Sequence, residues 1–355
     1  MNLELIGRTG TAESTAGLPA AIPTGTLEKL SLGGEEQDGD SDAAEARLAG
    51  FPPGSTLAPL LARGKPVGLL VLGPRQDGER YNRRDRIFLE TCAEQAAVAM
   101  ENARLYEEET EKERLQQELD TARRMQMAIL PERKPEIPGI DFFAYLSPAT
   151  EVGGDYFDYK LLDDGKLVFI VGDVSGHGVS AGTLVLMSKS CIFNQLRTNH
   201  EVEQVMVAMN EMVYGALAER LLMTFCYVIF DPAAGRLIYS IAGHPFPYHY
   251  RAAEGTMNEL DISAYPLGVT RKTSYQTAEV DFAPGDVFVF YSDGIVEAMN
   301  PEKEQWGFER FEQVIRAGVD QDAESLSASI LREFDTFRHD VPEDDDVTLV
   351  TIKIK

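Results

Sequence analysis

The chain is poor in cysteine and contains no long apolar run. Its three cysteines, Cys92, Cys191 and Cys226, show no paired spacing within 355 residues. This argues against a disulfide framework or a zinc knuckle and favours a reducing, cytoplasmic setting. The longest apolar runs, such as KLVFIVG and VFVFY, have the length of strands, so no membrane span is expected. No basic region followed by an apolar segment opens the sequence, so no secretory signal is expected either.

Basic residues are also in deficit. The chain has 33 lysines and arginines against 58 aspartates and glutamates, which gives a formal net charge of −25. A nucleic-acid partner is therefore disfavoured, because binding to a duplex needs clustered basic side chains. Part of the surplus lies in one run, EEQDGDSD from Glu35 to Asp42, which is typical of a solvated loop. The placement of the remaining acids is more informative than their number.

The length predicts more than one domain, and the sequence pattern divides the chain into three segments. The first, residues 1–106, contains a strand pattern, GKPVGLLVLGPR. A helix follows, with Asn82 as its cap and Asp85 in its first turn. One helix face is predicted to pack closely through a stripe of mostly small residues: Leu89, Cys92, Ala96, Ala99 and Ala103.

The second segment, residues 107–134, continues this helix without glycine or proline until Pro131. The phase of the apolar stripe shifts near residues 107–114, and Gln126 lies on the downstream seam. That seam has heptad-like spacing and consists of Leu115, Leu119, Ala122 and Ile129. Because so long a helix cannot bury its stripe alone, a parallel dimeric coiled coil is predicted. The alternative is a helix folded back on its own domain.

The third segment, residues 135–355, follows a proline-rich break and begins and ends with strands. Strand patterns IDFFAYLSP, DYFDYKLL and KLVFIVGDV precede two helices at about residues 180–219, split near RTNHEVE. MTFCYVIFD, GRLIYSIAG, FPYHYRA and DVFVFYSD are strands again, and helices at 308–318 and 323–337 precede the last strand, DVTLVTIKIK. This order predicts an α+β domain with antiparallel sheets packed face to face and helices outside.

Acids stand beside glycine or at strand ends in four places of this segment: VGGDYFD, FIVGDVSGHG, VFYSDGIVEA and EDDDVTLV. Any one of them alone is best explained as a turn. If all four converged in an empty pocket, their charges would repel strongly, since no matching group of lysines or arginines accompanies them. Divalent cations would remove that cost, and an all-oxygen ligand set suits Mg²⁺ or Mn²⁺ rather than zinc.

The stretch VGDVSGHGVSAG, residues 171–182, allows three interpretations: a serine nucleophile, a phosphate-binding loop or a metal ligand. A nucleophile elbow needs glycine two residues before Ser175, where this chain has Asp173. A phosphate loop needs a Gly-Lys-Ser/Thr ending, and Lys189 lies too far into the following helix. The metal interpretation remains.

The ordered motifs GGDYFD, GDVSGHG, AGHPFP, YPLGV, YSDGIVEA, WGFERF and DDDVTLV resemble those of the metal-dependent protein phosphatases, which are protein phosphatase 2C-like. The resemblance covers about residues 120–355 and is strongest to the bacterial branch that controls sigma factors through their anti-anti-sigma partners. It implies an αββα sandwich with two Mn²⁺ or Mg²⁺ ions. The implied activity is hydrolysis of phosphoserine or phosphothreonine on a small protein without a phosphoenzyme.

The same resemblance assigns site residues by their place in the motifs. Asp173 resembles the ligand that bridges both metals, and the Val174 carbonyl resembles the ligand beside it. Asp155 resembles a ligand or water-holder of one ion. Asp293 and Asp345 resemble ligands of the other.

Other positions in these motifs have open roles. Asp344 and Asp346 compete with Asp345, which is preferred because it stands three residues before Thr348, as in the family's acid-x-x-Thr pattern. His177 is either a proton donor to the leaving serine oxygen or a residue that fixes the loop, because Val174 and Ser175 interrupt the family's contiguous Asp-Gly-His. Two further expectations place Asp158 behind the ligands and His244 at the rim. The arginine that grips phosphate in the eukaryotic enzymes has no evident counterpart ahead of Asp155.

The first segment resembles the last strands and closing helix of a GAF domain. The match runs from LAPLLARGKPVGLLVLGPR through YNRRDRIFLETCAEQAAVAMENARLYEE, and only about 55 residues precede it. An opening helix and first strand are therefore expected to be missing, which leaves open a fragment of a longer protein or a degenerate domain. Dimerisation is a better-supported role for this segment than binding of a small molecule.

Together these patterns predict an α+β chain with three parts. A partial α/β GAF-like domain (1–106) and a long coiled-coil helix (107–134) precede the αββα phosphatase domain (135–355). The chain is expected to be a cytoplasmic homodimer that acts on a phosphorylated anti-anti-sigma factor, with the helix setting the state of the phosphatase. One alternative is an inactive phosphatase fold that serves as a scaffold. A nucleotide phosphodiesterase is a weaker one, because histidine ligands are missing.

Overall fold

The computed structural model describes residues 2–4, 21–23, 55–131, 133–216 and 221–355. The chain forms two compact units, Met1–Leu115 and Gln116–Lys355, which divide within helix α3 (Arg83–Met127). The acidic run at 35–42 and most of the region preceding LAPLL lie outside the described residues. The predicted domain limits at 106 and 134 stay predictions.

The N-terminal unit contains two antiparallel strand pairs, β1 (Asn2–Glu4) with β2 (Ala21–Pro23) and β3 (Thr56–Ala62) with β4 (Lys65–Leu72). The β3–β4 turn places Arg63 and Gly64 at positive φ, which suits a two-residue hairpin.

The first part of α3 packs on β3 through a narrower stripe than the sequence predicted. Leu89, Ala93 and Ala97 are buried against Ala58 and Leu60. The predicted stripe holds in part: Cys92 and Ala96 are partly buried, and Ala96 packs against this cluster, whereas Ala99 and Ala103 are exposed. The buried side chains recur every four residues, because the hairpin covers only one narrow row of the helix.

Two five-stranded antiparallel sheets form the centre of the C-terminal unit. The first has the order β12 (Ala278–Asp281), β9 (Arg236–Ala242), β8 (Met223–Asp231), β7 (Leu167–Val174) and β6 (Asp155–Leu161). The second has the order β11 (Thr256–Glu259), β10 (Tyr248–Arg251), β13 (Val287–Tyr291), β14 (Val347–Ile354) and β5 (Ile140–Ser147).

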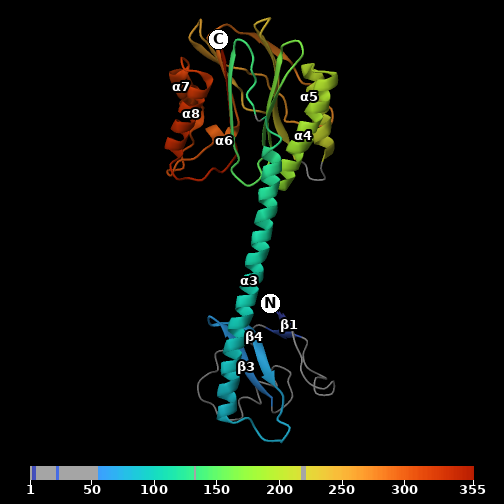
Figure 1. Ribbon diagram of the computed structural model, residues 1–355, viewed down its shortest axis with the longest axis vertical. Helices are drawn as coiled ribbons and strands as arrows, with labels where there is room; N and C mark the ends of the chain where they lie inside the picture. The colour runs from blue at the N-terminus through green and yellow to red at the C-terminus, as the bar shows by residue number, and fades with distance from the viewer. Residues whose placement is uncertain (1, 5–20, 24–54, 132, 217–220) are drawn as a thin grey trace. The chain divides into compact units, whose positions relative to one another are not determined.

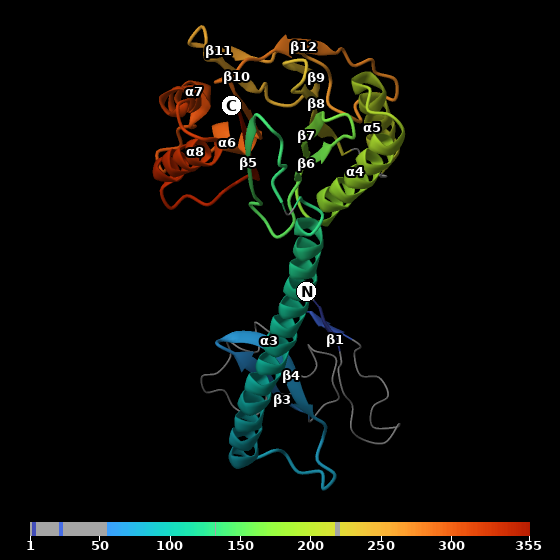
Figure 2. The same ribbon diagram turned by 45° about the horizontal axis from the view of Figure 1, so that its top comes forward.

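The sheets face each other across an aromatic and aliphatic core. Phe169 of β7 meets Phe290 of β13 edge to face, with ring centroids 5.0 Å apart. Helices α4 (Val179–Thr198) and α5 (Val202–Ala216) cover the outer face of the first sheet. Helices α7 (Gly307–Gly318) and α8 (Ala323–Arg338) cover the second, and the four layers are visible in Figures 1 and 2. The predicted αββα sandwich is confirmed.

Two structural differences from the sequence pattern bear on the site. Asp293, expected at the end of a strand, instead opens a one-turn helix, α6 (Asp293–Val296), directly after β13. The last residue of the predicted heptad seam, Ile129, packs against a core of the C-terminal unit, as does the neighbouring Leu130. Among the described helices, none is long and apolar enough to cross a membrane.

Candidate metal centre

Strands β6 and β7 place two acids directly opposite each other at one end of the first sheet. Asp155 begins β6 and pairs with Asp173 near the end of β7. Side chains of residues that pair directly across antiparallel strands project from the same face, about 4.5–5.5 Å apart at Cβ. Burial of Asp155 on this face therefore brings it beside Asp173.

Gly154 lets the backbone close tightly around this pair. A Cβ on Gly154 would overlap the Val174 carbonyl oxygen and come within 2.9 Å of Asp173 Oδ1. The Val174 N–H donates to the Gly154 carbonyl at 3.1 Å, which ties the two segments together. The carbonyl of Val174 and the carboxylate of Asp173 thus face the same small space, and only glycine leaves it open.

The second sheet contributes acids from two adjacent strands. Asp293 follows β13, and Asp345 and Asp346 precede β14. Gly294 allows these two segments to approach, because a Cβ there would overlap the backbone carbonyl of Asp346. Ser292 fixes the same junction: its hydroxyl accepts from Thr348 N–H at 2.8 Å, and its own N–H donates to the Thr348 carbonyl at 3.0 Å.

Hydrogen bonds join the two sheets at this end. The Thr348 hydroxyl donates to Asp155 Oδ2 at 2.6 Å. Asp346 accepts three backbone N–H groups, from Ala149 at 2.8 Å, Gly154 at 2.6 Å and Asp155 at 3.1 Å. Acids from both sheets are thereby held at one end of the sandwich.

The three consecutive acids before β14 therefore have different environments. Asp346 is buried and its oxygens already bind backbone N–H groups. Asp345 is exposed, and its recorded bond is to the N–H of Asp346. Asp344 lines a pocket beside the centre. Of the three, Asp345 combines an accessible carboxylate with proximity to Asp293, whose charge raises its pKa.

These carboxylates are costly to ionise together. Burial raises the pKa of Asp173 to about 8, and the charges of Asp293 and Asp345 add to the rise. Burial also raises the pKa of Asp155 well above its usual range, with the Asp173 charge as the next cause. Loss of water around the carboxyl is again the first cause of the raised pKa values of Asp293 and Asp345, although Asp345 as a whole residue is exposed. In the described part of the chain, no lysine or arginine forms an ion pair with these four side chains.

The donor chemistry of the centre fits hard divalent cations. Four carboxylates and one backbone carbonyl offer oxygen ligands only, and two of these donors, the Val174 carbonyl and Asp173 Oδ1, lie within 2.9 Å of where a Cβ on Gly154 would be. Within the described ranges, no three histidine, cysteine, aspartate or glutamate side chains already converge as ligands of one ion.

Four other residues singled out in the sequence have different places in the structure. His177 is exposed and lies near enough to Asp345 to lower that carboxyl's pKa. Ser175 uses its hydroxyl to accept the Leu222 N–H at 2.9 Å, so it fixes the loop.

His244, expected at the rim, is buried instead, and it bonds through Nδ1 to the Thr224 hydroxyl at 2.9 Å. Burial lowers its pKa to about 3, which keeps it neutral. Asp158 lies on the opposite face of β6 from Asp155, because side chains alternate along a strand, and it pairs with Lys189 of α4.

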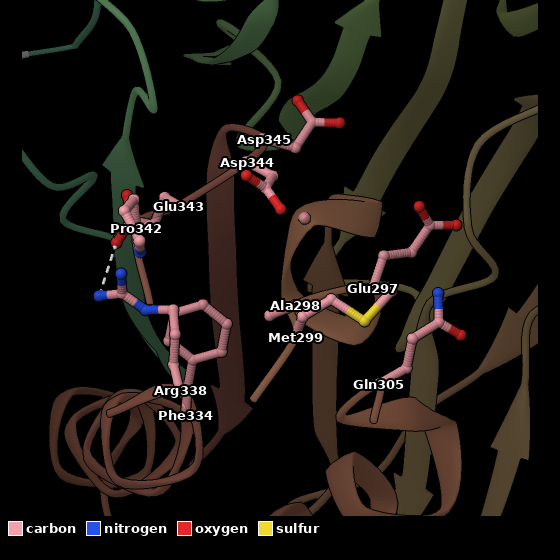
Figure 3. A pocket seen from close by; sticks show the side chains of 11 residues that line it. Glu297, Ala298, Met299, Gln305, Phe334, Arg338, Pro342, Glu343, Asp344 and Asp345 are labelled. Atoms are coloured by element: carbon pink, nitrogen blue, oxygen red, sulfur yellow. Dashed lines mark ion pairs between the residues drawn. The ribbon is translucent and has the colours of Figure 1, made fainter. Parts of the chain in front are cut away.

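A pocket of about 220 Å³ opens beside these acids (Figure 3). Asp345, Asp344 and Gly294 form its side toward the centre, and Met299 and Phe334 supply apolar lining. The Arg338 guanidinium reaches Glu343 at 3.2 Å and donates to the Val341 carbonyl at 2.6 Å. Arg338 thus holds the turn that leads to the three acids.

Proteins similar to this domain include named bacterial phosphatases. The family model described as Stage II sporulation protein E (SpoIIE) matches residues 163–355. Phosphoserine phosphatase RsbU of Bacillus subtilis is 24% identical over 183 residues, covering 52% of this chain and 54% of that protein. The chain spans about half the length of the curated relatives it matches, or less.

Solved structures share the fold. The SiaA-PP2C domain of Pseudomonas aeruginosa has a TM-score of 0.62 at 21% identity, covering 69% of this chain and 98% of that domain. The RsbU and RsbW domains of Rv1364c from Mycobacterium tuberculosis have a TM-score of 0.54 at 25% identity, covering 62% of this chain and 61% of that one.

Proposed function

Because the chain belongs to the Stage II sporulation protein E (SpoIIE) family, we propose that it is a metal-dependent phosphatase for phosphoserine or phosphothreonine on a small regulatory protein. The observation that carries the proposal is the meeting of Asp155, Asp173, Asp293 and Asp345 at one end of both sheets without an opposing cation among the described residues. A relative named as a phosphoserine phosphatase supports the same reaction.

We assign the ligands by their positions in the centre. Asp173 would serve both ions, with the Val174 carbonyl as the ligand beside it. Asp155 would serve one ion, and Asp293 with Asp345 would serve the other. When bound, Mn²⁺ or Mg²⁺ supplies an activated water and neutralises charge on the phosphoryl group. Bound cations would lower the raised pKa values of these carboxyls, because the positive charge offsets their mutual repulsion. The carboxyls would then be ionised.

Two further residues of the loop after β7, His177 and Ser175, have different proposed roles. We assign His177, exposed beside Asp345, as the group that delivers a proton to the leaving serine oxygen. Ser175 takes no part as a nucleophile in this proposal, since its hydroxyl is used to hold Leu222. The pocket lined by Met299 and Phe334 would receive the chain segment next to the phosphorylated residue.

The proposed substrate is a phosphorylated anti-anti-sigma factor that acts in trans. We further propose a cytoplasmic homodimer, with the GAF-like segment and α3 as its regulatory part. Exposed apolar side chains on α3 support a partner helix, among them Val98, Leu105 and Leu115.

The test is hydrolysis of a phosphoserine protein with Mn²⁺, comparing the full chain with Asp173→Asn. We expect Mn²⁺-dependent release of phosphate by the wild type and a loss of at least about 100-fold in the variant, the scale typical for removal of one group that stabilises the transition-state charge. The variant should keep a cooperative unfolding transition. Absence of activity in both proteins, with Mn²⁺ bound, would favour the scaffold alternative.

A further inference from the structure

A buried glutamine interrupts the apolar seam at the end of α3. The side chain of Gln126 is within the C-terminal unit, and the residue is only 6% exposed. Its Nε2 donates to the Gly153 carbonyl at 2.7 Å, and its Oε1 accepts from the Gly153 N–H at 3.1 Å. One side-chain amide therefore satisfies both backbone groups of one residue.

Gly153 leads directly into the candidate metal centre. The next residue, Gly154, donates its N–H to Asp346 and closes against the Val174 carbonyl. Asp155 follows and faces Asp173. The amide of Gln126 thus holds the chain two residues before a proposed ligand.

Other contacts confine the same loop from different sides. The Gly178 N–H, just before α4, donates to the Val152 carbonyl at 2.9 Å. A Cβ on Gly182 of α4 would overlap the side chain of Val152 and lie 3.9 Å from Gln126 Nε2. Figure 2 shows the end of α3 meeting these loops beside the start of α4. Gln126 is therefore part of the wall against which the loop is packed.

We propose that Gln126 is a positioning residue for the metal centre: its two hydrogen bonds set Gly153 and Gly154 so that Asp155, Asp173 and the Val174 carbonyl face one space. The proposal rests on the proposed function of that centre. Both bonds depend on the direction of one planar amide, so a rotation of α3 about its axis weakens them together. The helix and the ligand loop then change position as one system.

The experiment compares the full chain with Gln126→Leu, which keeps the approximate volume and removes both hydrogen bonds. Binding of Mn²⁺ is measured by calorimetry and by the metal-induced rise in Tm. We expect affinity to fall ten- to hundredfold, the range typical for loss of groups that orient metal ligands. Hydrogen exchange of the peptide spanning residues 149–155 should accelerate in the metal-free variant. With substrate, the half-activating Mn²⁺ concentration should rise while turnover at saturating Mn²⁺ stays near that of wild type.

Two variants control for lost stability and for position on the helix. Asn210→Leu removes a buried amide elsewhere in the unit, which bonds to the Gly268 N–H and the Thr270 carbonyl. It should lower Tm and leave Mn²⁺ affinity unchanged. Gln116→Leu removes an exposed amide on α3 that bonds to Glu151, and it should change neither quantity.

Three outcomes would overturn the positioning role: wild-type Mn²⁺ affinity in Gln126→Leu, unchanged exchange at residues 149–155, or an equal loss of affinity in Asn210→Leu. A wild-type chain that binds Mn²⁺ without hydrolysing phosphoserine would overturn the proposed activity, while the binding and exchange data would still decide the role of Gln126. A wild-type chain that binds no Mn²⁺ at millimolar concentration would overturn both.

Discussion

Asp345 and Asp346 are neighbours with opposite environments, and single substitutions should separate their roles. Asp346→Asn would turn an amide N–H₂ toward backbone N–H donors that now reach the carboxylate. We expect this variant to lose about 1–3 kcal/mol of unfolding free energy, the cost of leaving buried donors unsatisfied. Asp345→Asn should keep the stability of the metal-free protein and bind Mn²⁺ more weakly. Urea unfolding in EDTA measures the stability of each variant, and Mn²⁺ titration measures its metal affinity. Weaker Mn²⁺ binding by Asp346→Asn together with lower stability of Asp345→Asn would contradict these roles.

Asp173 should make the metal-free protein less stable as the pH rises. Its pKa in the folded chain is about 8, raised first by burial and then by the charges of Asp293 and Asp345. The unfolded chain releases the same proton near pH 4, so between about pH 4 and 8 the folded state holds more protons. Stability therefore falls across this interval.

Asp173→Asn lacks this titration, and it also relieves the charge that raises the pKa of Asp155. We expect its urea midpoint in EDTA to fall less from pH 5 to pH 8 than that of the wild type. An equal fall of the urea midpoint in the two proteins would contradict the claim that Asp173 is held among like charges.

At the level of elements, the closure of β6 on β7 depends on the missing side chain of Gly154. Gly154→Ala would drive a methyl group into the Val174 carbonyl and toward Asp173 Oδ1. We expect this variant to fold and to lose most of its Mn²⁺ affinity. The added methyl group would push apart the backbone segments that hold the Val174 carbonyl and the Asp173 carboxylate.

Gly215→Ala in α5 is the matched control, since nothing lies within 4 Å of its added Cβ. It should be neutral or stabilising by up to about 1 kcal/mol. Calorimetric Mn²⁺ binding distinguishes the two variants, and equal affinity in both would show that this close approach is dispensable.

The strands that sequence patterns predicted most clearly are those with buried side chains. Strands β7 and β13 are mainly apolar runs because both faces are covered, and β14 is buried along most of its length although it contains Thr348, Thr351 and Lys353. The strands β11 and β12 were not predicted, since they lie at sheet edges and carry polar residues such as TMNE and AEVD. Edge strands need no apolar face, so their pairing leaves little trace in composition.

Some residues of the candidate site could likewise be found from the sequence, and others could not. The acids beside glycines could be located from sequence because four such places recur in one segment, although any one of them alone is best explained as a turn. The roles of Gln126 and Asp346 could not, since each depends on a contact with backbone from a distant segment. Gln126 did leave a signal, a polar side chain on an apolar seam. The sequence does not indicate that Gly153 is the residue it binds.

At the scale of the whole molecule, the apolar side chains of α3 and of the turn that follows it have two uses. Ile129 and Leu130 pack on the cores of the C-terminal unit, and Gln126 binds Gly153. The positions left for a partner helix therefore lie upstream, where Leu115 is 47% exposed. We expect light scattering to show a dimer for the wild type and a shift toward monomer for Leu115→Glu, with an unchanged Tm of the C-terminal unit. If Leu115→Glu dimerised as tightly as the wild type, the dimer interface would not include Leu115.

If α3 regulates the centre by rotation, its helical phase should matter more than its length. Two extra residues inserted between Glu109 and Thr110 would rotate the upstream seam by about 200° relative to Gln126, whereas seven would return it to within about 20°. We expect the seven-residue insertion to keep Mn²⁺-dependent turnover within about twofold of wild type, because a heptad preserves the seam. The two-residue insertion should change turnover severalfold and alter exchange at residues 149–155. Equal activity in both would make the helix a passive spacer, and equal impairment would point to length rather than rotation.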